Sequence, residues 1–266
     1  MPELPEVETI ARGLRHKVLR RRIAAIEVAW QRSIDQRGVS EQLLVGDTIS
    51  DVRRLGKFVI LSLGSGRSVA IHLRMTGRLI VDPPAADPHT RLTLRFEDGG
   101  VLVFSDARKF GRWRVIEGDP SRALGIGIDP FDPALSASVF AGLVRKRATP
   151  IKTWLLDQRF LSGIGNIYAC EALFAARIRP RRRARSLSVS ERAQLLASLR
   201  KVMRKAIQHR GSSVDDYLDA EGMPGGFQKQ LAVYGRGGLP CRRCRTPIRR
   251  VVLAQRGTFY CPTCQQ

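Results

Sequence analysis

Hydrophobic residues recur with two different periods along this chain of 266 residues. Near the N-terminus, an apolar stripe at helical spacing predicts a helix over residues 5–18. Its members are Val7, Ile10, Ala11, Leu14 and Val18. From there to about residue 117, short apolar or alternating runs separated by turn residues predict a mostly β region, as in a β-sandwich. The expected strands cover residues 22–28, 58–63, 68–73, 78–81, 91–96, 101–105 and 112–116.

The helical period returns beyond residues 129–133, an Asp- and Pro-rich segment that we expect to be a linker. The clearest helix begins at Ser188, because Ser188 and Glu191 have the spacing of a capping box, and it ends before Gly211. We therefore expect an α+β protein of three parts. They are a β-sandwich with a leading helix (residues 1–131), a helical domain (132–236) and a cysteine-bearing tail (237–266).

Positive charge dominates the composition. Lysine and arginine number 46 against 24 acidic residues, which gives a formal charge of +22. Because 43% of the residues are hydrophobic, the chain can form cores and is not a disordered basic tail. The excess predicts a polyanionic partner, which is DNA, RNA or an anionic membrane face. Basic runs at 20–22, 181–185 and 242–250 favour one binding surface over separate solvated faces, and they predict affinity that falls steeply with salt.

We expect a cytoplasmic protein, because the sequence shows no recognisable targeting segment. No apolar run approaches the roughly 18 residues of a membrane-spanning helix, so we expect no membrane association. The opening residues MPELPE contain early acids and no charged-then-apolar leader, so we expect no signal peptide.

Four cysteines near the C-terminus form two C-x2-C pairs separated by 16 residues. This spacing predicts a tetrahedral zinc site, since two disulfides or free thiols are disfavoured in a cytoplasmic protein. Four thiolate ligands leave no open position, so the zinc would be structural. The ligands would be Cys241, Cys244, Cys261 and Cys264.

Between the two pairs, residues 248–253 and 258–260 predict a zinc-ribbon hairpin. Gln255 and Arg256 would lie near its tip, either in a nucleic-acid groove or in solvent. The fifth cysteine, Cys170, falls in an apolar stretch and is expected to fill the core.

The N-terminus offers candidate chemistry. Removal of Met1 would leave Pro2 as a secondary amine, and an α-amino group has a pKa of about 7.7–8.0, low enough to act as a nucleophile. Attack on a sugar C1′ would give an iminium ion that permits elimination at the neighbouring carbon. Glu3 and Glu6 stand beside Pro2 as candidate acid and base. Alternatively, they are ordinary first-turn acids at a helix N-terminus.

Three motifs together carry a resemblance that covers essentially the whole chain. The opening MPELPEVET, the segment LSGIGNIY at 161–168 and the four-cysteine ribbon resemble bacterial formamidopyrimidine-DNA glycosylases. The resemblance implies an enzyme of base excision repair that removes 8-oxoguanine and formamidopyrimidines from double-stranded DNA. It also implies cutting at the resulting abasic site by β,δ-elimination. The helical part would be a helix-two-turn-helix domain, and the protein would lie in the bacterial cytoplasm, associated with the nucleoid through DNA.

The resemblance also assigns residues to the chemistry. Pro2 would form the Schiff base, Glu3 would donate a proton and Glu6 would support the site. Lys57 would be the proton donor in β-elimination, although unaided it resembles a solvated loop residue. Arg256 would contact phosphates beside the lesion and serve δ-elimination.

Further residues would bind DNA. A damaged base must leave the stack, and the family fills the gap with a Met, an Arg and a Phe. The gap-filling residues here would be Met75, Arg108 and Phe110, although core packing is the alternative for Met75 and Phe110. The expected backbone contacts are His89, Arg147, Lys152 and Asn166. Arg74 and Ala107 depart from the usual small residue and proline, and residues 211–227 align with a loop that closes over the everted base.

Other functions fit parts of this pattern. An endonuclease VIII-type enzyme for oxidised pyrimidines shares the chemistry, although Leu4 and residues 7–9 argue against it. A non-catalytic zinc-ribbon protein that binds damaged DNA would leave Glu3 and Lys57 idle. RNA binding lacks the expected aromatic platform. We expect one structural zinc as the sole cofactor, and a monomer.

Overall fold

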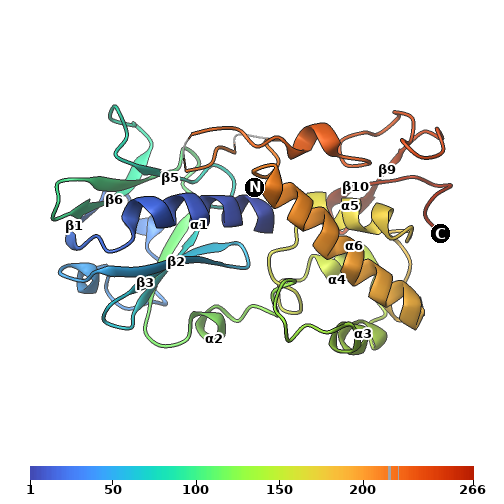
Figure 1. Ribbon diagram of the computed structural model, residues 1–266, viewed down its shortest axis with the longest axis horizontal. Coiled ribbons are helices and arrows are strands. Elements are labelled where there is room, and N and C mark those ends of the chain that lie inside the picture. Colours follow the sequence, from blue (N-terminus) through green and yellow to red (C-terminus); the bar gives the residue numbers. More distant parts are fainter. Residues whose placement is uncertain (215–216, 221) are drawn as a thin grey trace. The chain divides into compact units, whose positions relative to one another are not determined.

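The computed structural model describes residues 1–214, 217–220 and 222–266, and it divides into two compact units (Figure 1). Unit 1 comprises Met1–Gly125 and His209–Gly226, and unit 2 comprises Ile126–Gln208 and Phe227–Gln266. Most of the expected base-capping loop therefore groups with unit 1. Residues 215, 216 and 221 of that loop lie outside the described residues.

Unit 1 is a β-sandwich with one long helix. Helix α1 (Leu4–Val18) packs against β2 and β3, as its apolar stripe predicts. One antiparallel sheet has the order β1-β6-β7-β5, and the other has the order β2-β3-β4-β8. The first contains Ile23–Val28 (β1), Thr90–Phe96 (β6), Val101–Ser105 (β7) and Arg78–Val81 (β5). The second contains Ile49–Leu55 (β2), Phe58–Leu63 (β3), Ser68–His72 (β4) and Arg112–Ile116 (β8).

The two sheets share one core. Phe104 on β7 contacts Trp113 on β8, with ring centroids 5.9 Å apart. Short helices complete the unit: η1 (Gln31–Ser33), η2 (Glu41–Leu44) and α2 (Pro120–Leu124). The expected helix and strands are confirmed to within one residue, but β2 was not predicted. Its sequence, ISDVRRL, places two arginines in succession, which hides the alternation of a half-buried strand.

Unit 2 is helical and ends in a hairpin. Its helices are α3 (Ala137–Arg145), α4 (Ile151–Leu155), α5 (Asn166–Ala175), α6 (Val189–Gln208), η3 (Ala184–Ser186) and η4 (Phe227–Gln230). The hairpin pairs β9 (Arg249–Leu253) with β10 (Arg256–Tyr260), and α5 packs on α6 and β10. The capping box of α6 is confirmed, because Ser188 N–H donates to the Glu191 carboxylate at 2.7 Å and Glu191 N–H donates to Ser188 Oγ at 3.2 Å.

Within the described part of the chain, no helix is both long and apolar enough to span a membrane.

Candidate functional site

The expected nucleophile lies at the start of α1, beside two buried acids. Glu3 and Glu6 are 3% and 2% exposed. Glu3 N–H donates to Glu6 Oε2 at 2.9 Å, and the Glu3 carboxylate accepts from Glu6 N–H. This reciprocal capping box fixes both carboxylates next to Pro2. The positive end of the helix dipole adds a favourable field for negative charge at this position.

Glu6 also anchors the segment that follows α6. Ser212 N–H donates to Glu6 Oε1 at 2.7 Å, and the Tyr217 hydroxyl donates to the Glu6 carbonyl oxygen at 3.4 Å. Burial and the charge of Glu6 raise the pKa of Tyr217, so its hydroxyl stays a donor. Gly211 has φ of +80°, and a Cβ there would lie 2.8 Å from the Glu6 carboxylate. Glycine alone meets both constraints, and the start of the expected capping loop, at Gly211 and Ser212, therefore lies against Glu6 of α1.

Lys57 lies in the turn between β2 and β3 and is 8% exposed. Because α1 packs on both of these strands, the lysine and the N-terminal acids belong to the same unit. The positive charge of Lys57 acts on His72, which lies across from Phe58 in the β3–β4 register. The structure therefore replaces the expectation of a solvated loop residue with a mostly buried lysine.

His72 was not singled out from the sequence. Burial, reinforced by the charges of Arg74 and Lys57, lowers its pKa to about 3. Arg74 N–H donates to its Nδ1 at 3.0 Å, so the neutral ring carries its proton on Nε2. His72 is consequently an uncharged donor at neutral pH. A lone histidine in an apolar strand gives no sequence signal for such a role.

The expected gap-filling residues project from unit 1. Met75 and Phe110 are 42% and 48% exposed, which excludes the core-packing alternative. The Arg108 guanidinium lies 5.0 Å from the centroid of the Phe110 ring. Large exposed apolar side chains beside an arginine suit insertion into a base stack.

A buried carboxylate holds the two loops that carry these side chains. Asp106 is 1% exposed and accepts from Thr76 Oγ1 at 2.5 Å, in the loop of Met75. In the other loop, it accepts from Gly111 N–H at 2.7 Å and from Arg108 N–H at 3.3 Å. Asp106 N–H also donates to the carbonyl of His89, whose side chain is exposed. Asp106 was not predicted from the sequence, where its one signal is an acid directly before the basic loop 107–109.

In unit 2, Lys152 joins the helix-two-turn-helix loop to the hairpin. Its Nζ donates to Asn166 Oδ1 at 2.5 Å and to Thr258 Oγ1 at 2.6 Å, while Asn166 Nδ2 donates to the Gly257 carbonyl at 2.9 Å. Lys152 is 0% exposed. Because its amino group is enclosed by protein groups, Lys152 holds Asn166 and the hairpin in place, and its expected contact with DNA stays a prediction.

Arg256 and Arg147 are exposed in unit 2. The hairpin turns at Ala254 and Gln255, which have φ of +48° and +57°, and Arg256 follows as the first residue of β10. This places Arg256 beside the tip, as expected. The Arg147 guanidinium lies 4.1 Å from the centroid of the Phe160 ring.

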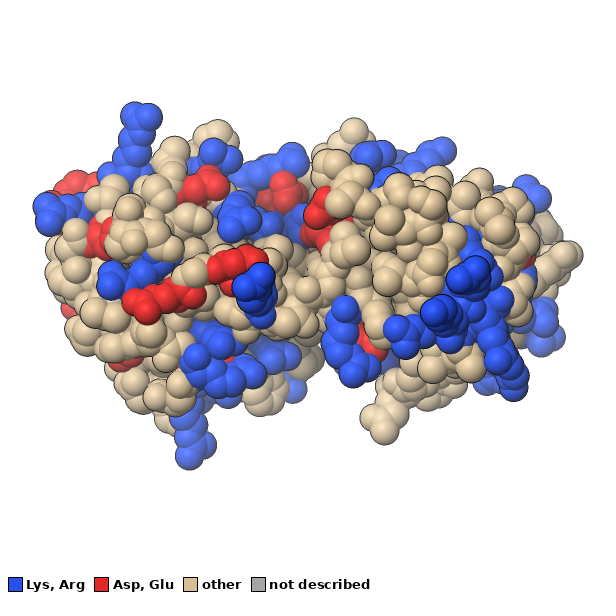
Figure 2. Space-filling view, turned by 90° about the horizontal axis from the view of Figure 1, so that it is seen from below, with Lys and Arg blue, Asp and Glu red and all other residues tan. Residues whose placement is uncertain are grey.

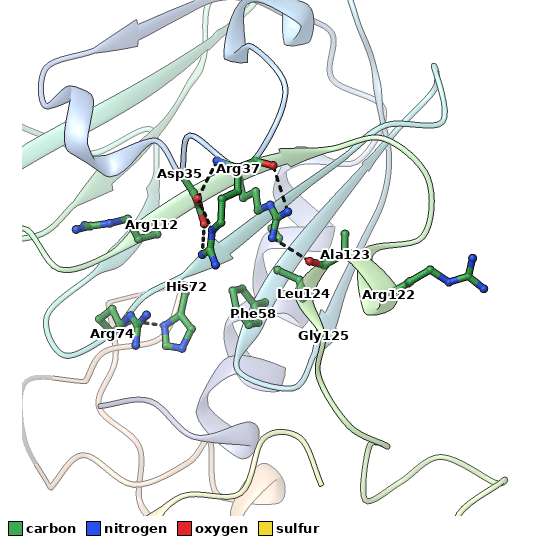
Figure 3. Close-up of a pocket in the computed structure, with 12 residues that line it drawn as sticks. Asp35, Arg37, Phe58, His72, Arg74, Arg112, Arg122, Ala123, Leu124 and Gly125 are labelled. Atoms are coloured by element: carbon green, nitrogen blue, oxygen red, sulfur yellow. Dashed lines mark hydrogen bonds and ion pairs between the residues drawn. The ribbon is translucent and has the colours of Figure 1, made fainter. Parts of the chain in front are cut away.

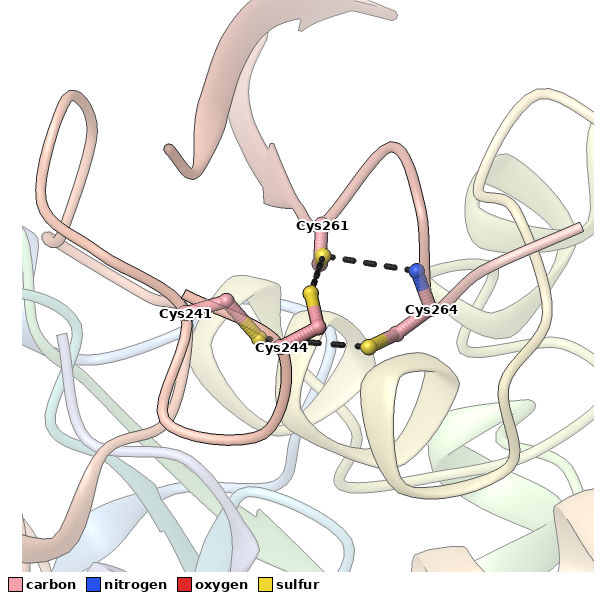
Figure 4. A group of neighbouring side chains, drawn as sticks. All are labelled: Cys241, Cys244, Cys261 and Cys264. Atoms are coloured by element: carbon pink, nitrogen blue, oxygen red, sulfur yellow. Dashed lines mark hydrogen bonds between the residues drawn. The ribbon is translucent and has the colours of Figure 1, made fainter. Parts of the chain in front are cut away.

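The four C-terminal cysteines form a metal site (Figure 4). Their sulfur atoms all lie within 4.8 Å of one another, with Cys244 and Cys261 Sγ atoms 3.4 Å apart. Tetrahedral zinc with Zn–S bonds of about 2.3 Å needs sulfurs about 3.8 Å apart, so the cluster fits one zinc ion. Backbone N–H groups of Arg243 and Cys264 donate to two of the sulfurs, as suits thiolates. Cys170 lies in the adjoining core, as expected.

Lys and Arg side chains form several groups on the molecular face drawn in Figure 2, among fewer acidic side chains and a larger area of other residues. This distribution agrees with a polyanionic partner.

Comparisons with known proteins agree over the whole chain. Residues 1–113 match the formamidopyrimidine-DNA glycosylase N-terminal domain, 126–217 match its H2TH domain, and 238–266 match the zinc finger found in FPG and IleRS. A formamidopyrimidine-DNA glycosylase of Chloroflexus aggregans is 44% identical over 100% of this chain and 98% of its own. The crystal structure of the MutM (Fpg) protein from Thermus thermophilus has a TM-score of 0.90, at 41% identity, covering 99% of this chain and 98% of that one. A Lactococcus lactis Fpg mutant in complex with Fapy-dG-containing DNA has a TM-score of 0.91, at 36% identity and full coverage of both chains.

Proposed function

This chain belongs to the formamidopyrimidine-DNA glycosylase family, and we propose that it excises oxidised purines from double-stranded DNA and then cuts the strand. It is a DNA glycosylase of DNA repair. The proposed bases are 8-oxoguanine and formamidopyrimidines, and the Lactococcus relative is in complex with DNA that contains Fapy-dG. One observation carries the proposal, namely the pair of buried acids fixed beside Pro2.

The proposed first step is displacement of the base. Once Met1 is removed, the Pro2 nitrogen attacks C1′ of the damaged nucleotide, and the glycosidic bond breaks. Glu3 protonates the departing base or the sugar oxygen. After losing its proton, the nitrogen uses its lone pair to form a double bond to C1′, and the C1′–O4′ bond breaks as the ring oxygen takes a proton from Glu3. The product is a ring-opened iminium ion that acts as an electron sink.

Elimination follows from the iminium ion. Loss of a proton from C2′ expels the 3′ phosphate, and a second elimination expels the 5′ phosphate. Lys57 assists the first departure as proton donor, and Arg256 binds phosphates beside the lesion and assists the second. A buried ammonium stabilises a leaving phosphate more strongly than a solvated one, because water screens it less.

Base eversion requires side chains that replace the lost stacking. Met75 and Phe110 would enter the gap, and Arg108 would pair with the widowed base. Asp106 positions these side chains through the loop contacts described above. Ser212 and Tyr217, which donate hydrogen bonds to Glu6, belong to the segment that would close over the everted base.

Backbone phosphates would be held mainly through unit 2. Asn166 at the first turn of α5, Arg147 and Arg256 would contact phosphates, and His89 would do so from unit 1. The zinc ion supplies no chemistry. It would hold the hairpin in shape through Cys241, Cys244, Cys261 and Cys264, since all four ligands come from the protein.

Borohydride trapping on an 8-oxoguanine:cytosine duplex tests the proposal. We expect a covalent adduct that mass spectrometry locates on Pro2, and none on an undamaged duplex or with Pro2→Gly. Trapping with thymine glycol but not with 8-oxoguanine would indicate the endonuclease VIII type. Tight binding without any adduct, with Pro2 confirmed as the free terminus, would indicate a non-catalytic binder and refute the proposal.

A further inference from the structure

The outer face of the β2-β3-β4-β8 sheet carries a cavity of about 210 Å³ (Figure 3). Alternate residues of these strands, such as Val59, Ile71 and Trp113, point into the sandwich core. The intervening positions point the other way, where Phe58 and His72 line the cavity. Helix α2 covers the apolar end of this face, so the remainder is a hollow with an apolar floor.

Five arginines line this cavity with a single carboxylate, so its formal charge is +4 (five minus one). The arginines are Arg37, Arg74, Arg112, Arg114 and Arg122. The carboxylate belongs to Asp35, which Arg37 engages with two bonds of 2.9 and 2.6 Å. Among the described residues, the other four guanidiniums have no ion-pair partner. Such a set of like charges is unfavourable unless an anion joins it.

Two of the arginines are held in place by backbone carbonyls. Arg114 Nη1 donates to Ala123 at 2.9 Å, and its Nη2 donates to Arg37 at 3.2 Å. Its Nε is buried and has no hydrogen-bond partner among the described residues. Arg112 Nη1 donates to the Gly111 carbonyl at 2.7 Å. These guanidiniums are therefore ordered before any ligand arrives, and one buried donor is left unsatisfied.

The donor set matches a phosphate. Guanidinium groups present paired N–H donors that fit two phosphate oxygens, and the neutral His72 ring adds an uncharged N–H. The apolar floor of Phe58, Ala70 and Leu124 lowers the local dielectric and strengthens these bonds.

The chain connects this cavity to the proposed reaction site. Phe58 follows Lys57 directly, and Arg74 directly precedes Met75. We propose that the cavity binds a backbone phosphate of the engaged DNA strand, outside the nucleotide that is processed. This inference rests on the proposed function. A free polyphosphate offers the same chemistry, and the test separates the two sources.

The test compares two double variants with equal loss of charge. Arg112→Gln with Arg122→Gln removes cavity arginines that have no ion-pair partner among the residues described. Arg67→Gln with Arg95→Gln, the control, removes arginines that are paired with Glu117 and Glu27 elsewhere on unit 1. Affinity for a duplex with a tetrahydrofuran abasic analogue is measured across a salt series. Each lost phosphate contact should reduce the slope of log affinity against log salt by about 0.9.

We expect the cavity variant to lose about one unit of slope and the control variant to match the wild type. Inorganic pyrophosphate is titrated calorimetrically against wild type and cavity variant in parallel. Weakened pyrophosphate binding with an unchanged DNA slope would support the phosphate site but overturn its DNA source. Unchanged slope and no pyrophosphate binding would overturn the inference entirely.

Two controls keep these outcomes interpretable. Arg122→Gln alone, at an exposed position on the short helix α2, guards against misfolding and should show a partial effect. Excision of 8-oxoguanine by the wild type is measured separately. A lack of excision would refute the proposed function. It would leave unchanged what the salt slopes say about phosphate binding in the cavity.

Discussion

Asp106→Asn is the sharpest test of how the gap-filling residues are held. The buried carboxylate accepts two N–H bonds and one O–H bond from two different loops. Asparagine keeps one acceptor oxygen, and its NH₂ group cannot accept from a backbone N–H. Because a hydrogen bond to a charged group contributes about 1.5–3 kcal/mol, we expect the free energy of unfolding to fall by about 2–3 kcal/mol.

The same substitution should affect the two proposed reactions unequally. Loosened loops would disorder Met75, Arg108 and Phe110, so excision of 8-oxoguanine should slow about tenfold, which corresponds to about 1.4 kcal/mol in the barrier. Cutting at a preformed abasic site should slow less, because no base has to be unstacked.

Urea unfolding and single-turnover kinetics measure these effects. Asp98→Asn, at an aspartate that pairs with Arg21 and is 55% exposed, is the matched control and should change neither quantity. Wild-type stability and wild-type excision in Asp106→Asn would refute the reasoning.

Three further predictions concern other parts of the molecule. The folded pKa of His72, about 3, lies below its ordinary value of 6.5, so only the unfolded state gains the proton as pH falls from 6.5 toward 3. The free energy of unfolding at pH 5 should therefore be about 2 kcal/mol below that at pH 7. In His72→Asn the midpoint of urea unfolding should change less between pH 7 and pH 5 than in the wild type, whereas His89→Gln should behave as the wild type does. Gly211→Ala should destabilise more than Gly118→Ala in thermal melts, because both have φ of +80° but only Gly211 meets Glu6; equal losses would contradict this contact. Cys244→Ser should release zinc, measured by a colorimetric chelator, and weaken DNA binding while unit 1 stays folded; unchanged zinc content would contradict the site.

Local patterns in the sequence predicted much of this structure. The apolar stripe of α1 and the alternation at the start of β8 follow from burial of one face of each element, whereas β7 is a continuous apolar run that is almost wholly buried. The zinc site was also predictable, because the spacing of the cysteines within each pair is a local feature of the sequence. Strand β2 was missed because its register is set by β3 and not by its own polar pattern.

Partners far apart in sequence were not predictable. Asp106 and Thr76 are 30 residues apart, and Lys152 and Thr258 are 106 apart. No local sequence pattern indicates either of these two hydrogen bonds. The same holds for the arginine cavity, whose members come from separate strands and loops. The expected roles of Lys57 and Arg256 came from the resemblance to a family. The residues around them in the sequence would not have indicated these roles.

The buried ammonium of Lys152 has a mechanical consequence. It locks Asn166 to the hairpin carbonyl that follows Arg256, so two proposed phosphate contacts keep a fixed separation. Because the separation of these two contacts is fixed, the DNA duplex has to deform in order to reach both of them. Duplexes that bend at low energetic cost should therefore be engaged preferentially, so the stiffness of the flanking sequence becomes part of what this chain recognises.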